Sequence, residues 1–515
     1  MLKLFLQFRA HQKLSNAVDG SGDITRKCDQ IKCHFQMHYY RIHRGRRTVP
    51  LQTLVGQSRY GKSRSKEEIT LHNRLGTCES YKKVKQRRNI MKNYTIKRSK
   101  ENGVPIPSHF SDNGWLTAAV DNKDWDDNSS LSGTEGRHQA VMTLYQDTTE
   151  PPATKPTLSE MGIEKTTKPS TDILPCQIVP PHEKPHKRPS LPEDFDLAEH
   201  YSDLIITHES EKAAEVAEQI EFAIALTRCG IPKATPFEGQ LPPWGGIHAL
   251  TTTYNPPLMR VGFGPIIPKP ITDRATVRKL LVNLQSIREQ MSQEHLAFFS
   301  DEGVLNIALD IILSEPGVFD DLFPLIGMFH HAKIIMRCGG RYLTGSGMDS
   351  SLIESGVFGS KTLQTVLSAT HYVRALSGLL IVSEVLHSLM FEAFWEQSQD
   401  DELICIQDVA LDLRNALSDK SRDRSTVKLN ELCENTDVLK RKMDVFLTEC
   451  AEKSGLCSYF MVFQEIVLTL KKIVIADRDG NWPLHVSAIG SSMRIFSEFD
   501  AYRYHKIASW YNERI

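Results

Sequence analysis

The chain has 515 residues, of which 40% are hydrophobic and 24% are charged. This composition is typical of a folded protein with room for two or three domains, and it excludes a wholly disordered or fibrous protein. Residues 1–100 hold 24 Lys or Arg against 6 Asp or Glu, whereas the rest of the chain holds 38 against 57. We therefore expect a basic N-terminal part that contacts polyanions, joined to an acidic body.

The cysteines indicate the compartment. Ten of them are scattered along the chain without the density of a disulfide framework. Such usage is typical of reduced thiols, so we expect a nuclear protein, or otherwise a cytoplasmic one.

Residues 1–66 are basic and irregular in pattern, and we expect a largely disordered arm. Within it, Cys28, Cys33, His38 and His43 follow one another at short intervals. These residue types bind Zn²⁺, but their spacing departs from that of a zinc finger. A basic arm without metal is therefore the favoured interpretation.

Residues 67–147 predict a basic helix followed by the first β-hairpin of an α/β core. The helix carries a cluster of five cations, namely Lys82, Lys83, Lys85, Arg87 and Arg88. Such a cluster indicates nucleic-acid binding or nuclear import. A solvated helix face is the alternative, and it stays open.

The hairpin presents the first candidate site residue. Residues 115–120 are small, aromatic and β-branched, which predicts a buried strand that ends on Asp121. Residues 137–146 predict its antiparallel partner. Ten prolines between residues 148 and 192 then predict a linker, assigned to residues 148–200.

Residues 201–335 should complete the α/β core. Helices are expected at 206–229 and 273–291, the second with apolar residues along one face. The apolar run 304–309 predicts a strand that ends on Asp310. A third strand-like run, 323–329, precedes His330.

Asp121 and Asp310 together suggest metal chemistry. Carboxylates from two strand ends can hold the Mg²⁺ ions of a phosphoryl-transfer site, and His330 could contact a phosphate or orient a water molecule. The alternative is that each Asp stabilises a turn and that His330 only begins a helix. No phosphate-binding loop is recognisable.

Residues 336–515 predict a helical region. Helices are expected at 361–395, 408–418, 435–452, 457–474 and 483–499. The most apolar stretch, 376–395, contains Glu384, His387 and Glu392, which favours a buried helix over a membrane span. We expect no membrane association, and the helices offer surfaces for protein partners.

Several segments resemble a group of uncharacterised animal proteins derived from DNA transposons. The matching stretches lie in order from about residue 70 to the end, and their order is more specific than any one of them. They are LHNRLGTCESY (71–81), AVDNKDW (119–125), GRHQAVMTLYQ (136–146), LPPWGGIHAL (241–250), ALDI (308–311), GMFHHAKIIMRCGGRYLTGSGMDSSLIESGVFGS (327–360), THYVRALSGLLIVSEVL (370–386) and ADRDGNWPLH (476–485).

The resemblance implies an RNase H-like domain with a helical insertion, in which Asp121 and Asp310 match the first two family carboxylates. Two departures bear on catalysis. The family's last acidic segment lies beyond Ile515, and Ile311-Ile312 replaces an aromatic residue after the second Asp. The implied protein is a transposase-derived nucleic-acid-binding protein with an impaired two-metal site, and the resemblance favours DNA over RNA as its partner.

The fold class expected overall is mixed α/β. It comprises an RNase H-like sheet split by a Pro-rich segment, a large all-helical insertion and a disordered basic N-terminal arm. The alternative function is a non-enzymatic helical scaffold for protein interactions whose basic N-terminus binds nucleic acid or directs the chain to the nucleus.

Overall fold

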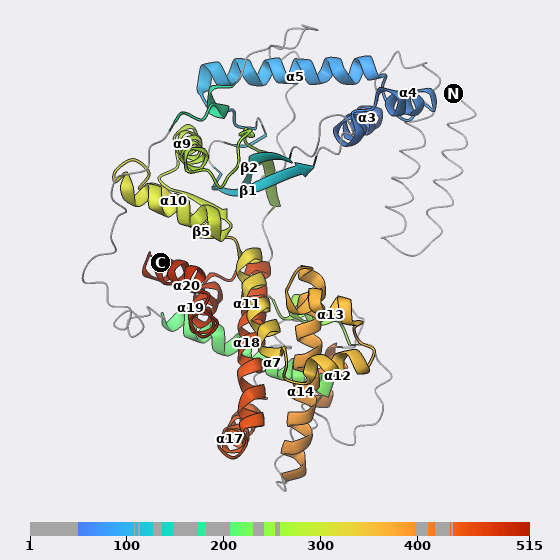
Figure 1. Cartoon of the computed structure of the whole chain (residues 1–515), viewed down its shortest axis with the longest axis vertical. Helices are drawn as coiled ribbons and strands as arrows, with labels where there is room; N and C mark the ends of the chain where they lie inside the picture. The colour runs from blue at the N-terminus through green and yellow to red at the C-terminus, as the bar shows by residue number, and fades with distance from the viewer. Residues whose placement is uncertain are drawn as a thin grey trace. The chain divides into compact units, whose positions relative to one another are not determined.

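The computed structural model describes eleven stretches of the chain (Figure 1). They are residues 50–107, 109–111, 114–126, 136–148, 174–181, 207–229, 241–252, 258–397, 410–417, 433 and 436–514. The zinc prediction at Cys28, Cys33, His38 and His43 lies outside them, as does most of the Pro-rich segment. The chain divides into two compact units, residues 1–105 with 152–178, and residues 106–151 with 179–515.

In its described residues the first unit contains three packed helices and a short 3₁₀ helix. They are α3 (Pro50–Ser63), α4 (Lys66–Arg74), α5 (Tyr81–Asn102) and η1 (Pro175–Gln177). Ser65 and Ser80 cap α4 and α5 by accepting hydrogen bonds from backbone N–H groups of the first turns. Ile69, Cys78 and Val84 form the core. Helix α3 corrects the expectation that residues 1–66 are one irregular arm.

The second unit contains a five-stranded mixed sheet. Its strands are β1 (Leu116–Asp126), β2 (Gly136–Thr148), β3 (Leu258–Phe263), β4 (Leu296–Ser300) and β5 (Leu322–Ile326). The order is β3-β2-β1-β4-β5. The β1–β2 and β2–β3 pairs are antiparallel, and the β1–β4 and β4–β5 pairs are parallel. The mixed α/β class and the pairing of the two predicted hairpin strands are confirmed.

The strand predicted at residues 304–309 is wrong. Those residues belong to α10 (Glu302–Ser314), whose buried residues include Val304, Leu305 and Ala308. A short apolar run fits a buried strand and a buried helix equally well, so its pattern does not decide between them. The sequence analysis did not predict the preceding strand, β4, or strand β3. Strand β1 also continues past Asp121 to Asp126.

Helices α9 (Arg274–Gln290) and α10 pack against each other. Both helices contact β5, and α9 also contacts β4. Asp273 caps α9, and the predicted apolar face of α9 is buried. On one face of the sheet, Phe299 and Phe323 pack against the main hydrophobic core. The ring centroids of Phe323 and Trp510 lie 6.4 Å apart, so this face meets the C-terminal helix α20 (Tyr502–Arg514).

Most of the remaining helices contribute to the main core, in which α11 and α18 pack side by side (Figure 1). Besides α20, the remaining helices are α7 (His208–Cys229), α8 (Trp244–Thr251), α11 (Met328–Leu343), α12 (Met348–Glu354), α13 (Ser360–Leu367), α14 (Tyr372–Gln397), α17 (Asp437–Lys453), α18 (Gly455–Asp479) and α19 (Trp482–Glu498). Leu439 and Met443 of α17 instead belong to a smaller core cluster. The helix predicted at 361–395 is two helices, α13 and α14. The strand predicted at 323–329 is shorter, because α11 begins at Met328.

Helix α14 is long and apolar enough to cross a membrane, judged by length and composition alone. Core helices of soluble proteins meet the same criterion, and 39% of its apolar window is buried within the protein. Leu379, Val382 and Leu386 of α14 are part of the main hydrophobic core.

Candidate site at the strand ends

Asp121 lies in β1, opposite Val141 of β2, and its side chain is exposed. Its Oδ1 accepts a hydrogen bond of 2.7 Å from the backbone N–H of Asn122. Its neighbours Leu116, Ala118 and Val120 are buried, and the alternation of a strand turns Asp121 to the opposite face.

Asp310 does not lie in the sheet. It is on α10, where it forms an ion pair with Arg274 of α9. Arg274 also donates a 3.0 Å hydrogen bond to the hydroxyl of Ser314 on α10. This interaction ties α9 to α10, so the expectation that Asp310 ends a strand beside Asp121 is corrected.

A different carboxylate, Asp301, follows the strand that pairs with β1. In the parallel register the last paired residues are Ala119 and Phe299, so that Asp121 lies two residues further along β1 and Asp301 lies just past the end of β4. Asp301 keeps an extended backbone (φ −72°, ψ 169°). Because residues two apart in an extended chain share a face, we expect Asp121 and Asp301 to lie near each other on one face, beyond the last paired residues.

Asp301 also has a structural role. Its Oδ1 accepts a 2.9 Å hydrogen bond from the backbone N–H of Val304, and it is therefore the N-cap of α10. The partial positive charge of a helix N-terminus favours the ionised carboxylate at this position.

Glu302 and residues of α20 surround Asp301. Helix α20 packs on α10. Burial raises the pKa of Glu302, the guanidinium of Arg503 opposes this rise, and the charge of Asp301 adds to it. Burial, with the charge of Glu302, raises the pKa of Tyr504 to about 12, and Arg337 acts against this rise. The strand end is thus acidic at its centre, with arginines nearby.

His330 lies in the first turn of α11, just after β5. The backbone N–H of Gly327 donates a 2.8 Å hydrogen bond to the carbonyl of Ser300, the residue before Asp301. His330 N–H in turn donates to the carbonyl of Gly327 at 2.9 Å. His330 is therefore part of a helix and not of a strand. This helix, α11, begins close to the end of β4.

The donor chemistry at this edge fits a hard cation. Carboxylate oxygens are the ligands that Mg²⁺ prefers. Within the described part of the chain, however, no group of three or more His, Cys, Asp or Glu residues gathers as a metal cluster. Two carboxylates alone bind Mg²⁺ less firmly than a complete two-metal site.

The predicted nucleic-acid residues lie on α5 in the first unit. Lys82, Lys85 and Arg88 are exposed. Arg87 instead donates from Nε to Oε2 of the buried Glu79 at 3.0 Å, which is a structural role. Lys83, the fifth member of the predicted cluster, is half-buried in the first turn of α5.

A hollow of about 600 Å³ lies between α3 and α5, lined in part by Arg87, Arg88 and Lys92. The guanidinium of Arg88 lies 4.8 Å from the ring centroid of Tyr60. The hollow is thus basic and lies on the helix that carries the predicted cluster.

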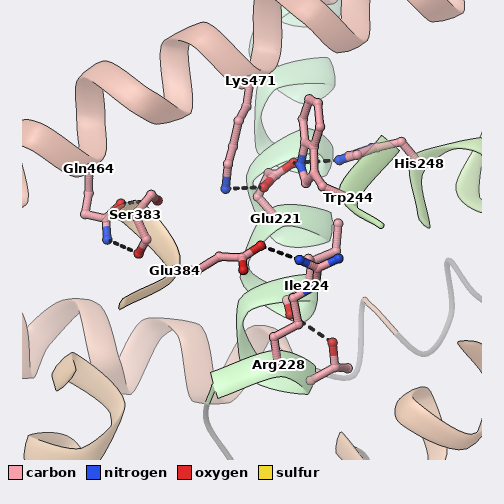
Figure 2. A network of polar contacts seen from close by, with 10 residues as sticks. Glu221, Ile224, Arg228, Trp244, His248, Ser383, Glu384, Gln464 and Lys471 are labelled. Carbon is pink, nitrogen blue, oxygen red and sulfur yellow. Dashed lines mark hydrogen bonds and ion pairs between the residues drawn. The ribbon is translucent and has the colours of Figure 1, made fainter. Parts of the chain in front are cut away.

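A second polar cluster is buried among the helices (Figure 2). Glu221 of α7 accepts hydrogen bonds at Oε1 from Trp244 Nε1 (2.7 Å) and His248 Nε2 (2.6 Å). Lys471 Nζ of α18 lies 2.7 Å from Oε2. Burial alone would raise the pKa of Glu221, but the charge of Lys471 and the contact with His248 lower it to about 2.

The buried cluster borders a hollow of about 280 Å³ between α7, α14, α17 and α18. Its lining is largely apolar, and His387 contributes an imidazole whose pKa burial and the nearby Lys471 lower to about 4. Ser383 and Gln464, which also line it, bond to each other (Figure 2). We assign this cluster a structural role, since its charges compensate one another.

Asp301 and the Glu221 cluster were missed by the sequence analysis. For Asp301 a signal existed, because the short apolar run 296–299 precedes a Ser and an Asp that can cap the helical pattern after it. For Glu221 none existed, because its partners lie 23 to 250 residues away in sequence.

Comparison with known proteins gives one match. No curated protein matches the chain. No solved structure matches it either. Residues 243–515, more than half of the chain, match a family model that covers β3 to β5 and all described helices from α8 onward. The chain belongs to the family described as "Domain of unknown function (DUF8702)".

Proposed function

We propose that the chain is a nucleic-acid-binding protein with an RNase H-like sheet, derived from a transposase, in which Asp121 and Asp301 are the remnant of a two-metal site. Asp301 replaces Asp310 in this proposal. One observation carries it, namely the parallel register of β1 and β4, whose last pair, Ala119 and Phe299, comes two residues before Asp121 and Asp301.

The sheet topology supports this proposal. Three consecutive antiparallel strands are followed by two strands parallel to the first, in the order β3-β2-β1-β4-β5. Helices connect β3 to β4 and β4 to β5, and the chain then enters the helical region after β5. An RNase H-like sheet with a helical insertion has this arrangement.

The chemistry at the strand ends supports cation binding more strongly than catalysis. Asp121 and Asp301 would hold a Mg²⁺ ion, which when bound activates an attacking oxygen and stabilises a leaving one. Asp301 is fixed by its capping bond to Val304, so it needs little reorganisation. With two carboxylates and no larger acidic cluster in the described residues, we infer an impaired nuclease.

The charge of the first unit supports the nucleic-acid part of the proposal. Lys82, Lys85 and Arg88 are exposed on α5, and the basic hollow beside them can hold a phosphate. Each phosphate contact displaces counterions, so binding of this kind weakens as salt rises.

The cation site is tested with Mn²⁺, which replaces Mg²⁺ and is visible by electron paramagnetic resonance. Asp121→Asn and Asp301→Asn should each weaken Mn²⁺ binding by about tenfold or more, because each removes one charged ligand. Asp310→Asn is the matched control and should bind as the wild type does. Unchanged affinity in both site variants would refute the cation site.

The nucleic-acid surface is tested by fluorescence anisotropy with a 20-base-pair duplex at several salt concentrations. Lys82→Gln with Lys85→Gln should lower the affinity and reduce the salt slope by roughly one per lysine that contacts a phosphate. Lys269→Gln with Lys453→Gln, at exposed positions of the second unit, is the control. Equal salt slopes for both double variants would contradict this part of the proposal.

A further inference from the structure

An exposed aromatic pair lies at the start of α11 and α14. Phe329 is 52% exposed although it is a large apolar residue. Its ring stacks on that of Tyr372, with centroids 4.8 Å apart and planes 28° from parallel. The ring of His330 meets Phe329 edge-on at 5.2 Å. Tyr372 is half-buried, so it supports one face of Phe329 while much of Phe329 remains open to solvent.

The aromatic pair adjoins the strand end that carries Asp301. Phe329 is two residues after Gly327, whose N–H bonds to the carbonyl of Ser300. The first turn of α11 therefore begins where β4 ends and Asp301 follows. A nucleotide whose base lies on Phe329 would have its phosphate near this strand end.

Basic residues follow the same surface. Lys333 and Arg337 lie on one face of α11 with the imidazole of His330, at helical spacing. Exposed His371 and Arg374 flank Tyr372 on α14. Arg337 donates a 3.3 Å hydrogen bond to the carbonyl of Ser368, just before α14, and so links the two helices.

Acidic side chains also lie near the aromatic pair and the strand end, and their charge counts against phosphate binding. Asp477 and Arg478 both act on Tyr372 electrostatically, with opposite signs, and Arg478 is the stronger of the two. Asp301 and Glu302 lie at the strand end, where the proposed cation would offset their charge. Around the aromatic pair the charges are thus mainly positive, which complements a phosphodiester backbone.

We propose that Phe329, supported by Tyr372, is a platform on which an unpaired nucleic-acid base stacks beside the strand end that carries Asp301. The inference rests on the proposed nucleic-acid function and adds the form of the substrate, a strand with at least one unpaired nucleotide. Aromatic rings flanked by cations bind single strands in this way, since every base has a face that can stack.

The test uses the full chain and a 15-nucleotide single-stranded DNA that contains 2-aminopurine, whose fluorescence falls on stacking. The buffer contains Mg²⁺, because the proposed cation offsets the charge of Asp301 and Glu302 at the strand end. The wild type should quench the probe. Phe329→Ala should bind it roughly 5- to 150-fold more weakly and lose the quenching. Phe329→Trp should restore both the affinity and the quenching, which excludes misfolding as the cause of their loss in Phe329→Ala.

Two controls define the outcome. Phe263→Ala removes a ring that is 76% exposed on β3 and should behave as the wild type does. A blunt 15-base-pair duplex offers no unpaired base, so Phe329→Ala should bind it normally. The platform is overturned if Phe329→Ala keeps wild-type affinity and quenching, or if it loses single-stranded and duplex binding equally.

The result is distinguishable from failure of the proposed function. If Lys82→Gln with Lys85→Gln weakens DNA binding but Phe329→Ala does not, only the platform is overturned, and the aromatic pair is then a protein contact. If the chain binds neither DNA, both nucleic-acid proposals are overturned. If Phe329→Ala acts as expected while Asp121→Asn and Asp301→Asn leave Mn²⁺ binding unchanged, the platform stands and the cation site fails.

Discussion

Nζ of Lys471 lies 2.7 Å from Oε2 of Glu221, and neither side chain is more than 7% exposed. The pair joins α18 to α7 in the interior of the helical region. Oε1 of the same carboxylate is held by Trp244 and His248 of α8. Three helices that are distant in sequence therefore meet at one buried charge.

Removal of one partner of this pair should destabilise the fold strongly. Lys471→Met leaves the Glu221 carboxylate buried without its cation. Glu221→Gln leaves the Lys471 ammonium buried without its anion. We expect each to lower the free energy of unfolding by about 3–5 kcal/mol, measured by urea denaturation. The exposed i,i+4 pair Arg441–Asp437 is the control, and Arg441→Gln should cost less than about 1 kcal/mol. Equal costs at the two sites would contradict the structural role.

Acid should destabilise the fold through His331. This residue is fully buried, its Nε2 lies 2.8 Å from the hydroxyl of Ser492, and burial with the nearby His485 lowers its pKa to about 3. The unfolded chain has a histidine pKa near 6.5, so below that pH the unfolded state binds a proton that the folded state does not. The stabilisation is complete above about pH 6.5 and declines as the pH falls towards 3.

The measurement is the free energy of unfolding between pH 7 and 4. His331 alone should contribute a loss of about 1.4 kcal/mol per pH unit below its unfolded pKa. His331→Gln should remove that part of the slope, whatever it does to stability at pH 7. His295→Gln, at an exposed position, should leave the slope unchanged. An identical slope in His331→Gln would show that the imidazole is charged in the folded state.

Elements with strong local signals were predictable from the sequence. The capped amphipathic helix α9 and the β1–β2 pair follow from periodicity and alternation alone. The strand predicted before Asp310 failed, because residues 304–309 are apolar in a pattern that helix and strand share. Only the cap at Asp301 and the packing on α9 and α20 decide for helix.

The proposed site differs from the predicted one in its second carboxylate. The sequence predicts a second Asp at the end of a strand, and the proposal takes Asp301, which follows β4, in place of Asp310. This choice requires the register of β4 on β1, which is a long-range property. The partner of Asp310, Arg274, lies 36 residues away and has no local signature.

Gly340 should be irreplaceable in α11. A Cβ built on it would lie 2.0 Å from the carbonyl oxygen of Leu367, since the end of α13 packs directly on the backbone there. We expect Gly340→Ala to lower the free energy of unfolding by about 1–3 kcal/mol, measured by denaturation. Gly339→Ala is the matched control, because its Cβ would meet side-chain atoms no closer than 3.4 Å. Similar costs for both would mean that α13 can move away.

Asp301 should show two separable roles. Its carboxylate caps α10 through Val304 N–H, and an amide oxygen can accept the same bond. Asp301→Ala should therefore lower the free energy of unfolding by about 1 kcal/mol, whereas Asp301→Asn should change it by only a few tenths. Denaturation in EDTA measures this role alone. If Asp301→Asn keeps full stability yet loses Mn²⁺ binding, the charge serves the cation site and not the cap. If Asp301→Asn keeps both full stability and Mn²⁺ binding, the capping role accounts for this residue entirely. The acidic strand end is then the start of a helix without a bound cation.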